Sequence, residues 1–160
     1  MNASGRANKS PEEKVAASQL YDRDFYAWAN EQAALLRAGK LSEADIEHIA
    51  DAVESLGKTE KREFVSRLRV LMLHLLKWRF EPGKRTPSWE ASIKIQRLDL
   101  LEHLQDNPSL RPVIATILEK AFKGAVLEAI AETGFPDKTF PQQCPWTFEE
   151  MMAEDFWPEG

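Results

Sequence analysis

The sequence lacks the features that mark several specialised classes of protein. Its 160 residues contain one cysteine, Cys144, which excludes an internal disulfide and a cysteine-based zinc site. The longest strongly apolar run is Val70–Leu76, which is far too short to cross a bilayer. The polar N-terminus has no apolar segment of the signal-peptide type. We therefore expect a protein without a membrane segment that is located in the cytoplasm.

Signals for β-structure are also missing. The chain has no Asn-Gly or Asp-Gly turn pair and no sustained alternation of apolar and polar residues. Its nine prolines leave long windows free of proline, and apolar residues recur in these windows at helical spacing. The sequence therefore predicts an all-α fold.

Capping residues and glycine stops divide the chain into five main helices and a short last helix. The predicted helices cover about 24–38, 42–56, 59–80, 89–105, 109–133 and 148–155. Ser42 begins the second helix and Gly57 ends it in this interpretation. Residues 1–18 are predicted to be a mobile polar arm, and residues 19–160 a single helical domain.

The second and third predicted helices carry the most informative apolar patterns. The third is apolar on nearly all sides over residues 70–76, which is typical of a helix buried on several sides. We predict that it is the central helix of a bundle or part of a subunit interface. The second has an apolar stripe that we expect to be buried, formed by Ile46, Ile49, Ala50, Val53 and Leu56.

Charge is distributed unevenly along the chain. The net charge is −5, but residues 58–97 contain 11 basic and 4 acidic residues, a balance of +7 that leaves −12 for the remainder. Glu43, Glu47 and Asp51 follow one another at a spacing of four, where like charges destabilise a helix. We expect basic residues of the 59–80 helix to compensate them.

The basic segment also suggests an anion-binding site near the start of the fourth predicted helix. Arg79, Lys84, Arg85 and Trp89 lie close together in sequence there. A helix N-terminus offers backbone N–H donors, and arginine pairs readily with phosphate. This pattern indicates a phosphate or nucleic-acid ligand, although a sequence pI of about 5.3 disfavours nucleic acid.

Motifs for catalysis and metal binding are absent. There is no Gly-x-Ser-x-Gly elbow, no Walker-type loop and no His-Glu-x-x-His. The three histidines, His48, His74 and His103, lie in three different predicted helices and lack the paired Glu-x-x-His motifs of di-iron bundles. We predict no metal site and no cofactor. The sequence leaves open whether the protein is an enzyme and favours one without catalytic activity.

Several segments resemble a bacterial family known as domain of unknown function 29. They span about residues 20–158 in the same order: Tyr21–Trp28, Val53–Gly57, Arg67–Trp78, Ser88-Trp89, Asn107–Pro112, Thr133-Gly134, Phe140-Pro141 and Cys144–Thr147. The resemblance implies a small, soluble, helical bacterial protein and brings no assigned catalytic or binding residue.

The apolar third helix and the missing motifs together predict a non-enzymatic protein–protein interaction module. Its partner is a second copy of the chain or another helical protein. Two alternatives stay open at this point. One is a nucleic-acid or phosphate-binding protein that uses residues 78–89, and the other is an enzyme without a recognisable motif.

Overall fold

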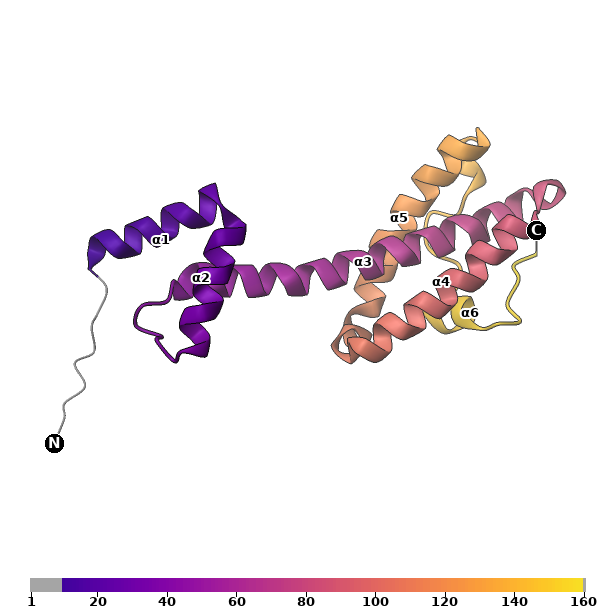
Figure 1. Ribbon diagram of the computed structural model, residues 1–160. Coiled ribbons are helices and arrows are strands. Elements are labelled where there is room, and N and C mark those ends of the chain that lie inside the picture. The colour runs from indigo at the N-terminus through magenta and orange to yellow at the C-terminus, as the bar shows by residue number, and fades with distance from the viewer. Residues whose placement is uncertain (1–9, 160) are drawn as a thin grey trace. The chain divides into compact units, whose positions relative to one another are not determined.

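The computed structural model describes residues 10–159 and contains only helices and loops in that range (Figure 1). The all-α prediction is therefore confirmed. The elements are α1 (Pro11–Arg23), α2 (Phe25–Arg37), α3 (Ile46–Phe80), α4 (Pro87–Asp106), α5 (Ile114–Thr133) and α6 (Phe148–Met152), with 3-10 turns at Pro82–Lys84, Pro108–Val113 and Asp137–Thr139.

The residue contacts gather in two compact units, Met1–Lys58 and Thr59–Gly160, which we call the N-terminal and C-terminal units. The boundary between them falls within α3. Of the predicted polar arm, residues 1–9 lie outside the described part of the chain, whereas residues 11–18 belong to α1. The capping box of Ser10 and Glu13 starts this helix. The extent of a single domain over 19–160 stays a prediction.

The largest difference from the predicted helices is at Gly57. The second and third predicted helices are one continuous helix, α3, and Gly57 lies in its interior. Gly57 does not adopt the positive φ of a helix stop, unlike Gly39 and Gly134, which have φ of 70° and 72°. The start is also different, because Asp45 rather than Ser42 precedes the first helical residue and accepts a hydrogen bond from the His48 backbone N–H.

The N-terminal unit has a very small core. Among residues 10–58, the buried ones are Ala17, Trp28 and Gln32. The stripe that we expected to be buried is mostly exposed, with exposed fractions of 49% for Ile46, 62% for Val53 and 70% for Leu56. That prediction of burial is wrong, because no helix in the described chain covers this face of α3.

The C-terminal unit contains the main hydrophobic core. The C-terminal half of α3 supplies seven buried residues, from Phe64 to Leu76, and α4, α5 and the segment after α5 pack around it. Figure 1 shows α4, α5 and α6 gathered around this half of α3. The prediction of a long central helix is confirmed here, since the segment that is apolar on all sides is enclosed.

The end of the chain is fixed to this core. The rings of Trp157 and Trp78 lie 4.7 Å apart between centroids. The guanidinium of Arg97, on α4, donates to the carbonyl oxygens of Met151 and Phe156 at 2.7 and 2.6 Å. Arg97, one of the basic residues of segment 58–97, is therefore a buried structural residue.

Candidate functional site

The predicted anion-binding residues make most of their contacts within their own segment. The Arg85 side chain donates from Nε to the Trp78 carbonyl at 2.8 Å, and its guanidinium lies 4.9 Å from the centroid of the Trp78 ring. Lys84 Nζ lies 2.7 Å from Glu81 Oε1. The ammonium of Lys84 is therefore already compensated by a carboxylate.

The other two predicted residues have different neighbours. The Arg79 guanidinium lies 5.2 Å from the Phe80 ring, and the Trp89 ring faces Lys77 Nζ at 4.4 Å. Within residues 10–159, no carboxylate forms an ion pair with Arg79 or Arg85. Their positive charge is thus the part of the predicted site that could serve an anion, and the role itself stays a prediction.

The expected pairing of the acidic stripe with the following basic helix does not occur. Glu47 and Asp51 belong to the same continuous helix as the basic residues that follow them, so the two segments cannot pack face to face as neighbouring helices. Glu43 pairs with Lys40 in the preceding loop. The basic residues of α3 instead find carboxylates on α4 and α5, as in the ion pair of Arg67 with Asp99 and that of Lys77 with Glu132.

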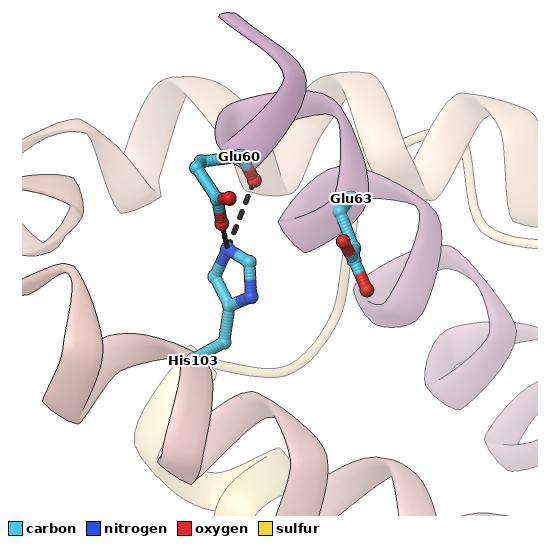
Figure 2. Close-up of side chains that lie close together, drawn as sticks. All are labelled: Glu60, Glu63 and His103. Carbon is cyan, nitrogen blue, oxygen red and sulfur yellow. Dashed lines mark hydrogen bonds and ion pairs between the residues drawn. The ribbon is translucent and has the colours of Figure 1, made fainter. Parts of the chain in front are cut away.

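A group of potential metal ligands lies at the junction of α3 and α4, inside the C-terminal unit (Figure 2). One ligand atom each from Glu60, Glu63 and His103 lies within 4.8 Å of the other two. His103 Nε2 is 2.9 Å from the Glu60 carbonyl oxygen and 3.4 Å from Glu60 Oε2. The His103 side chain is 10% exposed, whereas the two glutamates are about half exposed.

The sequence alone does not reveal this cluster. Glu60 and Glu63 are three residues apart on a helix, which places both carboxylates on one face, and this spacing is a detectable signal. The missing information is that His103, over forty residues later, lies beside them. Only the packing of α4 on α3 supplies that.

A family model described as "Domain of unknown function DUF29" matches residues 20–157 of the chain. The chain belongs to the DUF29 family. The resemblance of the quoted motifs is therefore confirmed. No curated protein and no solved structure matches the chain, so the family brings no reaction or ligand to it.

The N-terminal unit of this DUF29 protein has a second polar arrangement, around Asp45. The Asp45 carboxylate lies 2.8 Å from His48 Nδ1 and accepts a hydrogen bond from Trp28 Nε1 at 3.3 Å. The buried side chain of Gln32 accepts from the Asp45 backbone N–H at 2.7 Å. A surface cavity of about 530 Å³ adjoins Asp45 and His48. These contacts fix the start of α3, which is sufficient to explain the pair.

Two further features of the DUF29 chain are the state of its single cysteine and the polarity of its helices. Burial raises the pKa of the Cys144 thiol, although a hydrogen bond with the Trp146 backbone acts in the opposite direction. The thiol is therefore poorly ionised at neutral pH and is a weak nucleophile. Among the described residues, no helix is long and apolar enough to cross a membrane.

Proposed function

We propose that this DUF29 protein is a non-enzymatic protein–protein interaction module that pairs with a second copy of itself through the N-terminal half of α3. The observation that carries the proposal is an apolar stripe of exposed Ile46, Val53 and Leu56 with half-buried Ile49, which we call the α3 stripe. Exposed apolar surface of this continuity commonly marks an interaction site.

The spacing within the α3 stripe is that of a helix-pairing seam. Its residues follow one another at intervals of three, four and three, the a and d positions of two heptads. Ile46 and Val53, which are branched at Cβ, occupy the a positions, and Leu56 occupies a d position. The second heptad, with Val53 at a and Leu56 at d, has the combination that favours two-stranded helix pairs, whereas the first heptad has isoleucine at both positions.

The residues flanking the α3 stripe support a second copy as its partner. The flanking e and g positions hold Ala50, Ala52 and Gly57, which are small and uncharged. The acidic residues of this part of α3, Glu47 and Asp51 among them, lie at the outer positions. Two identical helices could therefore pair without bringing like charges together at the seam.

Gly57 gives an independent reason to expect close helix contact. Glycine inside a helix destabilises it by about 1 kcal/mol relative to alanine. Apart from its chain neighbours and the nearby backbone of α3, a Cβ atom at Gly57 would meet no atom of the described chain within 4 Å, so no packing contact inside the chain requires glycine. A partner helix crossing at this point would require it.

The test compares two leucines of equal exposure. Leu56 is 70% exposed and Leu127, on α5 of the C-terminal unit, is 69% exposed. Sedimentation over a range of micromolar concentrations should show a monomer–dimer equilibrium for the native chain. Leu56→Glu should raise the dissociation constant at least about tenfold, since burying one leucine contributes about 1.5–3 kcal/mol. Leu127→Glu should leave it unchanged.

Gly57→Ala sharpens the same test. The alanine should stabilise the monomer and weaken the dimer, because its methyl group holds the two helices apart. A native chain that remains monomeric at all concentrations would refute the proposal. So would equal effects of Leu56→Glu and Leu127→Glu, since the α3 stripe would then have no special role.

We further propose that the protein acts in the bacterial cytoplasm. The single cysteine is consistent with a reducing compartment, and the family resemblance supports a bacterial source. Anion binding through Arg79 and Arg85 is a second candidate function, supported by the absence of carboxylate partners for these two side chains within residues 10–159.

A further inference from the structure

We propose that Glu60, Glu63 and His103 bind a divalent transition-metal ion, with zinc the best match to their chemistry. The site lies wholly within the C-terminal unit and connects α3 to α4 (Figure 2). It is independent of the α3 stripe and of the proposed self-association.

The hydrogen bond of His103 prepares its imidazole for a metal. A carbonyl oxygen only accepts hydrogen bonds, so the 2.9 Å contact with Glu60 O places the ring proton on Nε2. In the neutral ring, Nδ1 then carries the free lone pair. Metal-bound histidines almost always donate their other N–H to a carbonyl or carboxylate in this way. Figure 2 shows the second ring nitrogen turned toward the side on which Glu63 lies.

The carboxylates each retain an oxygen that could bind the ion. Arg67 bonds Glu63 only at Oε1, from Nη2 at 2.8 Å and from Nε at 3.2 Å. The contacts of the Glu60 carboxylate with His103 and Asn107 both involve Oε2. Glu63 Oε2 and Glu60 Oε1 therefore have no partner among the described hydrogen bonds and ion pairs.

The spacing of the three ligand atoms is close to that of a bound site. Bonds of about 2.0–2.2 Å at a tetrahedral angle put two ligand atoms roughly 3.4 Å apart. One ring nitrogen of His103 and one carboxylate oxygen of each glutamate lie within 4.8 Å of one another, so side chains must turn to bring Nδ1 and the free carboxylate oxygens to these distances. The half-exposed glutamates can rotate to do this, while the Phe64 ring, 5.8 Å from the His103 ring, holds the imidazole.

The donor set selects the class of ion. One imidazole nitrogen and two carboxylates suit zinc and its transition-metal neighbours, whereas magnesium and calcium prefer oxygen donors alone. Three protein ligands leave the fourth position of tetrahedral zinc for water. Because the ion would join two helices of the folded chain, its binding should stabilise the C-terminal unit.

Titration calorimetry with zinc chloride on the tag-free full chain tests the site. The native chain should bind one zinc ion and unfold at a higher temperature when zinc is present, with no comparable effect of magnesium. His103→Gln should weaken zinc binding at least tenfold. Glu63→Gln should weaken it similarly, and this variant retains the His103–Glu60 contact, so it remains informative if His103→Gln fails to fold.

The matched control is His48→Gln, which removes the histidine paired with Asp45 in the N-terminal unit. It should bind zinc like the native chain. The proposal is overturned if the native chain binds no zinc, if Glu63→Gln binds as the native chain does, or if binding is lost in His48→Gln and kept in His103→Gln.

Discussion

Arg97 allows a quantitative test of how the end of the chain is held. Its side chain is 5% exposed and donates to the carbonyls of Met151 and Phe156, with a longer bond of 3.4 Å to Glu154 O. The guanidinium also lies 5.3 Å from the Trp157 ring centroid. Arg97→Met keeps much of the apolar stem and removes all of these interactions.

The expected loss can be estimated from the two short bonds. A hydrogen bond to a charged group contributes about 1.5–3 kcal/mol, so two contribute about 3–6 kcal/mol. Burial offsets part of this stabilisation, because it disfavours the charged form of Arg97 and so lowers the pKa of its guanidinium. The negative charges of Asp155 and Glu154 act on that pKa in the opposite direction. Removing the buried cation recovers that part, so we expect Arg97→Met to reduce the free energy of unfolding by about 2–4 kcal/mol.

Urea unfolding followed by circular dichroism and tryptophan fluorescence measures this loss. Arg97→Lys should fall between the native chain and Arg97→Met, since one ammonium cannot bond both carbonyls in the same geometry. Arg67→Met is the matched control. Its ion pairs are about one-third exposed or more, so it should change stability by only about 0–1 kcal/mol. Equal stabilities of Arg97→Met and Arg67→Met would refute the reasoning.

Three further predictions concern other parts of the chain. Gly124→Ala should give no gain in melting temperature, because its Cβ would lie 2.6 Å from Arg69 Cδ and displace that side chain; a clear gain would contradict this. Inorganic phosphate at low salt should raise the unfolding temperature of the native chain but not that of the Arg79→Ala/Arg85→Ala variant. Equal rises for both chains would exclude the anion site. Since burial raises the pKa of Cys144, alkylation by iodoacetamide at pH 7 should be slower than for a free cysteine and should accelerate as the pH rises; reaction at the free-cysteine rate would show that the thiol is not buried.

Local signals in the sequence were sufficient for several helix ends. Asp24 caps α2 by accepting a hydrogen bond from the Ala27 backbone N–H at 3.0 Å, and Gly134 ends α5 at a φ of 72°. Thr147 and Glu150 form the capping box of α6. Such ends depend on contacts between residues two to four apart, so they can be read without knowledge of the fold.

The candidate sites were less accessible from the sequence. The spacing of three between Asp45 and His48 indicates that their side chains can meet on one face of a helix. The contacts of Asp45 with Trp28 and Gln32 cannot be predicted from that spacing. The Glu60–Glu63 spacing was visible too, although its histidine partner was not. Residues that are far apart in the chain come into contact only when helices pack, so the local sequence does not predict which of them become neighbours.

The sequence by itself determined the helical class, the family and the position of the apolar stripes. The tertiary structure decided what covers each stripe and what each charge contacts. It left the α3 stripe exposed, kept Gly57 inside a continuous helix and buried Arg97 against the end of the chain. The physical reason is that helix formation follows from neighbouring residues, whereas burial and charge pairing depend on segments that are far apart in the chain.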